Sequence, residues 1–142
     1  MRTISLFLLL ICCNSKNKEI AKKDYTNLIE IALNICPEVE SYYHFETEDR
    51  RRINLLIGKN SQLTHTIKCF GYNVNSGKKY QKDNSTWIEI WNYKKINANE
   101  FYLLYKIENE GVFVETTITK SNGKWIENEC KITETKDNKP TT

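Results

Sequence analysis

Cysteine and histidine are the residue types in this chain that could do chemistry, and both are few. Beyond the apolar N-terminal stretch the cysteines are Cys36, Cys69 and Cys130, and the histidines are His44 and His65. In an oxidising compartment one pair of these cysteines can form a disulfide and leave the third as a thiol, but the sequence does not choose the pair. The alternative is that all three are small, buried, apolar residues.

His65 alternates with Leu63, Ile67 and Cys69, so we expect its side chain to point inward or into a pocket. An inward histidine is most often a hydrogen-bonded core residue, and the alternative is a general base in a pocket. A nucleophilic pair of His65 with Cys69 or Cys36 has no local sequence support. The chain has no CxxC motif and no HExxH spacing. The sequence therefore predicts no catalytic residue, no metal site and no cofactor.

Trp87 and Trp91 could line a binding face, because aromatic side chains suit such surfaces. Both lie on one face of the strand predicted at 87–93, and Ile88 and Ile90 lie on the other face. That strand is apolar on both sides, so it is either central and covered or presents an interaction surface. With an inward His65, the two tryptophans are the candidate lining of a pocket.

The charge of the chain limits its partners. Its formal net charge is +3, and loss of Arg2 with a leader would reduce it to about +2, too small to indicate a nucleic-acid partner. The acidic and basic run at 46–52 is typical of a solvated turn with internal charge pairing. The stretch 73–85 is rich in lysine and nearly free of apolar residues, which predicts a long exposed loop that could carry function.

The first thirteen residues form a short apolar segment that ends in two cysteines. Leu10-Ile11-Cys12-Cys13 is followed at once by a polar stretch that begins with Asn14. This resembles the lipobox of bacterial lipoproteins, above all the short leaders of Bacteroidota lipoproteins, although Cys12 stands where Gly, Ala or Ser is usual. The resemblance implies cleavage before Cys13, whose thiol would receive diacylglycerol and whose amine a further acyl chain. Several acyl chains would anchor the protein firmly.

The leader has two further interpretations. An ordinary secretory leader cut after Ser15 would place the small residues Cys13 and Ser15 at the −3 and −1 positions and give a secreted protein. A retained N-terminal anchor is the other. The lipoprotein interpretation predicts a cell-envelope protein, anchored at the periplasmic face or the cell surface. It divides the chain into a signal peptide at 1–12, a lipidated tether at 13–18, one domain at 19–135 and a disordered tail at 136–142.

A helix is expected at about 19–35, because apolar residues recur there at helical spacing and Pro37 prevents its continuation. The expected stripe consists of Ala21, Tyr25, Leu28, Ala32 and Ile35, widened by Ile29 and Cys36. Such a stripe needs a sheet to cover it.

The second half of the chain predicts an antiparallel meander. Its four strands are expected at 87–93, 101–107, 112–119 and 124–133, where β-branched and aromatic residues gather. Burial favours Ile118 opposite Ile126 across a 121–123 loop and Ile107 opposite Val114 across the preceding turn. A strict two-residue Asn-Gly loop would set Ile118 opposite Glu127, so the longer loop is preferred.

The stretch 41–74 is less regular. We expect a strand at 41–47 and a hairpin of 52–57 with 63–69, in which Ile57 lies opposite Leu63. A short helix at 49–57 is the alternative, since short apolar runs do not distinguish helix from strand.

These patterns predict an α+β fold with one N-terminal helix packed on a curved antiparallel sheet that ends in a four-strand meander. A small β-barrel is the alternative. The element order over residues 19–134 is similar to that of the cystatin-like and nuclear-transport-factor-2-like group, which by itself implies no function.

The expected function is that of a membrane-anchored envelope lipoprotein, a non-catalytic binding or accessory module such as an inhibitor, immunity factor or complex subunit. Its expected partners are the membrane and another envelope protein, and it is not expected to be an enzyme. The alternatives are a small enzyme of cone-shaped fold, with His65 as base in a pocket between helix and sheet, and a plain secreted binding protein.

Overall fold

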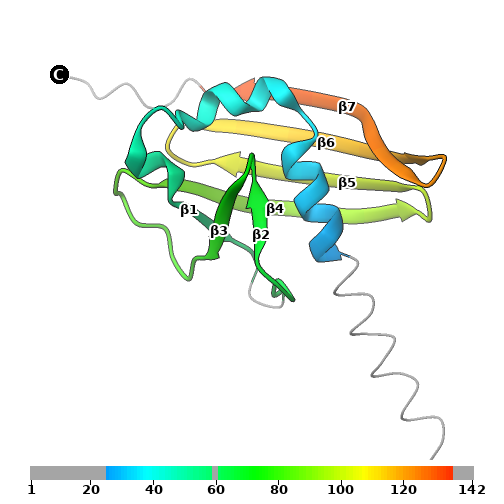
Figure 1. Cartoon of the computed structure of the whole chain (residues 1–142), viewed down its shortest axis with the longest axis horizontal. Coiled ribbons are helices and arrows are strands. Elements are labelled where there is room, and N and C mark those ends of the chain that lie inside the picture. The colour runs from blue at the N-terminus through cyan, green and yellow to red at the C-terminus, as the bar shows by residue number, and fades with distance from the viewer. Residues whose placement is uncertain (1–24, 59–60, 136–142) are drawn as a thin grey trace, which may run out of the picture.

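The described residues form a curled, mixed sheet of seven strands in the order β2-β3-β1-β4-β5-β6-β7 (Figure 1). A computed structural model describes residues 25–58 and 61–135, so Cys13, the tether and the tail lie outside the described residues. Residues 25–34 are α-helical, and two 3₁₀ helices follow, η1 (Pro37–Tyr43) and η2 (Glu48–Arg51). The strands are β1 (Ile53–Leu56), β2 (Ile67–Cys69), β3 (Tyr72–Ser76), β4 (Thr86–Asn97), β5 (Glu100–Ile107), β6 (Val112–Ser121) and β7 (Lys124–Glu134).

The sheet is curved as expected, but the prediction that it is wholly antiparallel is wrong. β1 lies between β3 and β4 and runs parallel to both, with Ile53 opposite Val74 on one side and Thr86 on the other. The expected hairpin of 52–57 with 63–69 is also wrong, because β2 pairs with β3 instead. Ile53 is fully buried, and the central position of β1 provides that burial. β2 and β7 end the strand order, so these seven strands do not close into a barrel.

The segment predicted as a strand at 41–47 is not one. Pro37 opens η1, where its fixed φ suits the first turn of a helix, and the turn buries Val39 and Tyr43 on one side. The helix ends at His44, whose φ of 54° is left-handed. Val39 and Tyr43, four residues apart, are therefore buried by helical and not by strand spacing.

The four-strand meander from β4 to β7 is present, but the expected register of its last hairpin is wrong. Ser121 pairs with Lys124 across a two-residue turn, in which Asn122 and Gly123 have φ values of 49° and 76°. Two consecutive positive φ values are what a tight Asn-Gly hairpin turn requires. Ile118 consequently lies opposite Glu127, the pairing that burial alone argued against.

A β-bulge allows β7 to have this tight turn and still place its apolar side chains on one face. The register shifts between Thr117 and Ile118, so that Thr116 pairs with Cys130 and Val114 with Ile132 farther along. In the β5–β6 hairpin the expected register is wrong by two residues, since Ile107 pairs with Val112. A shift of two keeps every side chain on its face, so the inward set is unchanged.

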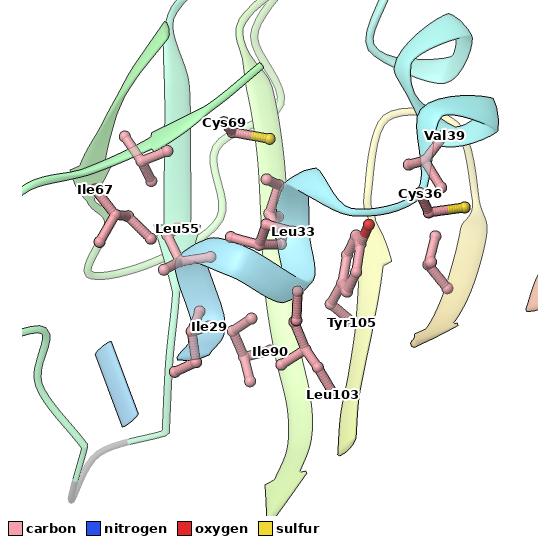
Figure 2. Packing of buried hydrophobic residues seen from close by; sticks show 14 of the residues in the cluster. Ile29, Leu33, Cys36, Val39, Leu55, Ile67, Cys69, Ile90, Leu103 and Tyr105 are labelled. Carbon is pink, nitrogen blue, oxygen red and sulfur yellow. The ribbon is translucent and has the colours of Figure 1, made fainter. Parts of the chain in front are cut away.

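Buried residues of the N-terminal helical segment belong to the same hydrophobic cluster as the strands. Ile29 and Leu33 lie beside Leu55, Ile90 and Leu103 in that cluster (Figure 2). Burying a side chain such as Leu33 contributes about 1.5–3 kcal/mol. The sequence stripe omitted Leu33, which is fully buried, and included Ile35, which is only partly buried. The buried face is thus rotated relative to the predicted one.

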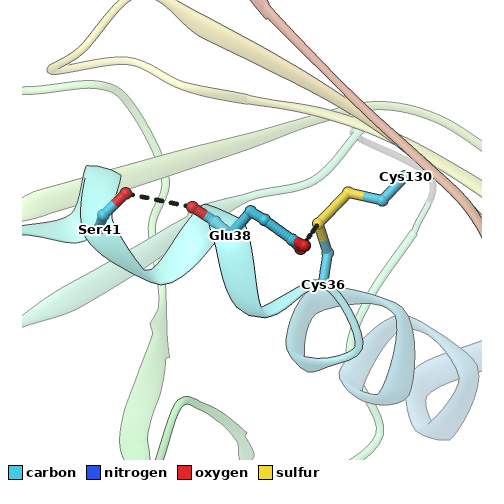
Figure 3. The surroundings of a disulfide bond; sticks show 4 residues. All are labelled: Cys36, Glu38, Ser41 and Cys130. Atoms are coloured by element: carbon cyan, nitrogen blue, oxygen red, sulfur yellow. Dashed lines mark hydrogen bonds between the residues drawn. A yellow bond between two sulfur atoms is a disulfide. The ribbon is translucent and has the colours of Figure 1, made fainter.

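A disulfide joins Cys36 to Cys130, 94 residues apart in sequence (Figure 3). It connects the chain between the helical segment and η1 to the edge strand β7. Tyr42 reinforces the same connection by donating its hydroxyl to Glu134 Oε1 at 2.8 Å. Cys69 is a free, buried cysteine.

Candidate functional site

A polar pocket of about 470 Å³ lies where the lysine-rich loop 77–85 passes over the sheet. The pocket is built from the start of β1, the end of β3 and the start of β4, which parallel pairing brings to neighbouring positions. Its lining residues are Arg52, Asn54, Asn75, Ser76, Gly77, Lys78, Lys79, Gln81, Asp83, Ser85 and Trp87. Loop 77–85 is the part of the predicted 73–85 loop that remains irregular, since residues up to Ser76 form β3.

Asp83 holds the loop against the sheet. Its Oδ1 accepts hydrogen bonds from the backbone N–H of Ser85 at 2.9 Å, the Ser85 hydroxyl at 2.5 Å and the Trp87 indole N–H at 2.9 Å. These bonds, the Ser85 hydroxyl first, lower the pKa of Asp83 below its ordinary value. One oxygen of this carboxylate, Oδ1, therefore fixes the loop to Ser85 and to Trp87 at the start of β4.

Trp87 forms the floor of the pocket and is only 4% exposed. Tyr80 packs edge-on against it with ring centroids 5.7 Å apart. Gly77 passes directly over the ring, and a Cβ at this position would lie 2.9 Å from Trp87 Cζ3 and 3.2 Å from Leu56 Cδ2. Glycine is the residue that lets the loop approach the tryptophan so closely.

Asn109 ties the start of β4 to the β5–β6 turn. Its Nδ2 donates to the carbonyl of Ser85 at 2.9 Å, and its Oδ1 accepts the backbone N–H of Trp87 at 2.8 Å. Asn54 Nδ2 donates to Ser85 Oγ at 2.9 Å from β1. The start of β4 at the pocket wall is thus hydrogen-bonded to β1, to the β5–β6 turn and, through Asp83, to loop 77–85.

The pocket carries an excess of positive charge. Arg52, Lys78 and Lys79 line it with a single carboxylate, Asp83. Arg52 also pairs with Asp49 at 3.1 Å, whereas within the described residues neither lysine forms an ion pair. Cationic and amide donors in one concave site suit a ligand that carries a carboxylate or phosphate.

The three residues expected to share a pocket are separated. Trp87 lines the polar pocket, whereas Trp91 is 55% exposed and packs edge-on against Phe113 at 4.7 Å. His65 is exposed and does not point into the core as one half of the prediction had it, and it lines a different open hollow beside β3. The alternation failed because β2 begins only at Ile67 and the chain bends at His65.

The cysteines and histidines do not assemble into a nucleophilic pair within the described part of the chain. The sulfur of Cys36 is used in the disulfide, and Cys69 is buried in the core. Burial raises the pKa of the Cys69 thiol to about 12, so it stays protonated near neutral pH. The hydroxyl groups of Tyr43 and Tyr105 are buried in the same part of the core as this thiol.

A smaller hollow of about 160 Å³ lies between the helical segment and the sheet. Its lining includes Tyr25, Ile29, Leu63 and Tyr93, and Tyr93 shares a 2.6 Å hydrogen bond with Ser61. His65 is not among its described lining residues. The described lining of this hollow thus does not include the residue that the enzyme alternative named as base.

One group of side chains has the spacing of metal ligands. Cys36, Glu38 and Glu127 bring ligand atoms within 4.8 Å of one another. Glu38 Oε2 lies 3.4 Å from Cys36 Sγ (Figure 3). Because that sulfur is bonded to Cys130, it is not available as a thiolate ligand.

In the described ranges, no helix has the length and apolar character needed to cross a bilayer. No family model, curated protein or solved structure matches the chain. The polar pocket under loop 77–85 is therefore identified by its geometry and charge.

Proposed function

We propose that this chain is a lipid-anchored protein of the bacterial cell envelope whose folded body is a non-catalytic binding module. The polar pocket under loop 77–85 is its ligand site, and the ligand is anionic. The observation that carries this proposal is the lining of that pocket, in which Arg52, Lys78 and Lys79 face a cavity of about 470 Å³. Its one carboxylate is Asp83, whose Oδ1 accepts hydrogen bonds from Ser85 and Trp87.

The anchor is supported by the leader. The apolar run that ends in Leu10-Ile11-Cys12-Cys13 and the polar stretch after it resemble a lipobox, with Cys13 as the acylated residue. A disulfide between Cys36 and Cys130 is in keeping with an exported protein, because such bonds persist in oxidising compartments.

The fold of this module is inferred to be α+β, with the helix predicted at 19–35 packed on the concave face of the sheet. Leu28, Ile29, Ala32 and Leu33 support this arrangement, since all four are buried in the cluster that also contains the strand residues. The helix and the disulfide would then close one face of the sheet and leave the pocket on loop 77–85 open.

Ligand binding is tested by titrating the isotope-labelled mature chain with inorganic phosphate and with citrate, and with glucose as a neutral control. We expect amide chemical shifts of residues 77–85 to move with both anions and not with glucose. The variant Lys78→Gln/Lys79→Gln should weaken the effect, whereas Lys68→Gln/Lys131→Gln, which lies outside the pocket lining, should not. Equal responses at the two lysine pairs would show only unspecific charge attraction and reject the site.

The anchor is tested by intact mass and membrane fractionation of the protein made in a bacterial host. We expect a mature chain that begins at an acylated Cys13 and sediments with membranes. Cys13→Ala should abolish acylation, and the matched change Cys12→Ala should retain it. A mature chain that begins at Lys16 without acyl groups would reject the anchor.

A further inference from the structure

The turns of two hairpins lie side by side at one end of the sheet. The β4–β5 turn at Ala98 and Asn99 is joined to β6 by a hydrogen bond from the backbone N–H of Lys120 to the carbonyl of Asn99 at 2.7 Å. Glu100 pairs with Thr119 beside it. Both turns are at the right of the sheet in Figure 1, and loop 77–85 is at the other end of β4. We call this end the hairpin end, residues 94–100 and 120–126.

The hairpin end is strongly basic. It holds four lysines and one glutamate in these two ranges, Lys94, Lys95, Lys120 and Lys124 against Glu100. All four lysines are exposed. Glu100 is only partly exposed and accepts a hydrogen bond from Asn97 at 3.2 Å. Anionic groups are therefore attracted to this end from solution.

Apolar side chains are interleaved with these lysines. Ile96 and Ile126 are 47% and 48% exposed, which places them among the most exposed large apolar residues of the described chain. Trp125 packs against the hydrophobic cluster with part of its indole exposed, and Lys120 lies 5.9 Å from the centre of its ring. Aliphatic and indole groups that alternate with lysine suit the boundary between lipid headgroups and acyl chains, where both kinds of group are satisfied.

The described chain begins near the same end. Tyr25, the first described residue, packs against Tyr93 and Phe101 with ring centroids 5.6 Å and 6.3 Å away. Tyr93 and Phe101 directly adjoin residues 94–100 in the two strands of the hairpin. The twelve residues from Cys13 to Asp24 can span at most about 40 Å. A lipid at Cys13 therefore keeps the hairpin end within reach of the bilayer.

From these observations we infer that the hairpin end docks on an anionic bilayer surface. The inference rests on the proposed function for the direction of the tether, but its lysines and isoleucines act without the acyl chains. Docking would place the polar pocket at the distant end of β4, a strand of 12 residues, and so about 36 Å from the headgroups. The pocket would then face away from the membrane, open to solutes or to a partner.

The test uses the full mature chain with Cys13→Ser, so that no acyl chain contributes. Binding is measured by co-sedimentation with vesicles of phosphatidylcholine and phosphatidylglycerol, and with vesicles of phosphatidylcholine alone. We expect binding to the anionic vesicles only, with loss at about 1 M salt, where screening acts over about 3 Å. Each lysine near an anionic surface contributes about fivefold to the partition coefficient, so Lys94→Gln/Lys120→Gln/Lys124→Gln should lower it by about a hundredfold.

The matched control is Lys68→Gln/Lys82→Gln/Lys131→Gln, which removes the same charge from exposed lysines outside both the hairpin end and the lining of the polar pocket. It should leave the partition coefficient unchanged. Circular dichroism of both triple variants checks that each is folded. In vesicles with brominated lipids, quenching of tryptophan fluorescence should also fall in Trp125→Phe and not in Trp87→Phe.

Three results would overturn the inference. These are equal binding to neutral vesicles, equal losses in the two triple variants, or no binding to anionic vesicles at low salt. None of these bears on acylation of Cys13 or on phosphate binding by loop 77–85, so failure of the docking surface is distinguishable from failure of the proposed function.

Discussion

Trp87 donates its indole N–H to Asp83 Oδ1 at 2.9 Å, and this bond closes the loop over the ring that forms the pocket floor. The same carboxylate oxygen accepts both donors of Ser85. One buried aromatic ring and one acidic side chain four residues before it thus shape the candidate site.

Asp83→Asn should loosen this loop and destabilise the fold by about 0.5–1.5 kcal/mol at neutral pH, the net worth of an ordinary hydrogen bond. The hydrogen bonds from Ser85 and Trp87 hold the pKa of Asp83 below its ordinary value. The stabilisation is therefore present above about pH 4 and is lost as the pH falls through the folded-state pKa. Urea unfolding of both proteins at several pH values, followed by tryptophan fluorescence, should show the difference in the free energy of unfolding shrinking in acid. A difference that grows in acid would contradict the role of the carboxylate.

Gly77→Ala should destabilise the protein by about 1–3 kcal/mol, because the added methyl overpacks the contact with the Trp87 ring. It should also weaken phosphate binding, since the loop must move off the pocket floor. Gly58→Ala is the matched control, because a Cβ there meets nothing within 4 Å. Thermal unfolding and phosphate titration measure both effects. Equal stability of the two variants would show that loop 77–85 does not lie on Trp87.

Removal of the disulfide in Cys36→Ala/Cys130→Ala should lower the free energy of unfolding by about 4–5 kcal/mol in the chain-entropy model, since the bond closes a loop of 94 residues. Reduction of the wild-type protein should have the same effect, and Cys69→Ala should still respond to reduction. Urea midpoints with and without a dithiol measure this. Alkylation of all three cysteines in the folded, unreduced protein would disprove the pairing.

The protein should become less stable in alkali because the buried Cys69 thiol resists ionisation in the folded state. Burial raises the pKa of its thiol to about 12, above the ordinary value near 9, so the unfolded chain releases this proton first. Below about pH 9 the thiol is protonated in both states, and its contribution to stability is fully present. As the pH rises from there toward 12, the free energy of unfolding falls by up to about 1.4 kcal/mol per pH unit. Tyr105, whose pKa burial also raises, adds to this trend above about pH 10.

Cys69→Ala is the variant that isolates the thiol. It is expected to be less stable than wild type at pH 7 because of the cavity it leaves, and to show a shallower loss between about pH 9 and pH 10. Urea unfolding across that range provides the slope. An unchanged slope would mean that the thiol ionises as readily in the folded protein as in the unfolded one.

The register of the β6–β7 hairpin is a part of the meander that the sequence did not predict correctly. The Asn122-Gly123 turn was visible in the sequence, but burial of Ile118 argued against its two-residue form. The structure has both the tight turn and a buried Ile118, because a bulge next to Thr117 moves β7 by one residue. A bulge leaves no strong mark in a single sequence, since any exposed residue can occupy it.

The sequence by itself determined which side chains of β5 and β6 face the core. Leu103, Ile107, Val112 and Val114 are all buried as their alternation predicts, because strand side chains alternate whatever strand lies beside them. It also predicted a lysine-rich exposed loop at 73–85, of which 78–84 is exposed in the structure. Only the tertiary structure decided that β1 lies parallel between β3 and β4, that Cys36 pairs with Cys130, and that Arg52 meets Lys78 and Lys79 around one cavity. These relationships join segments far apart in the chain, and their energy depends on packing that no local pattern encodes.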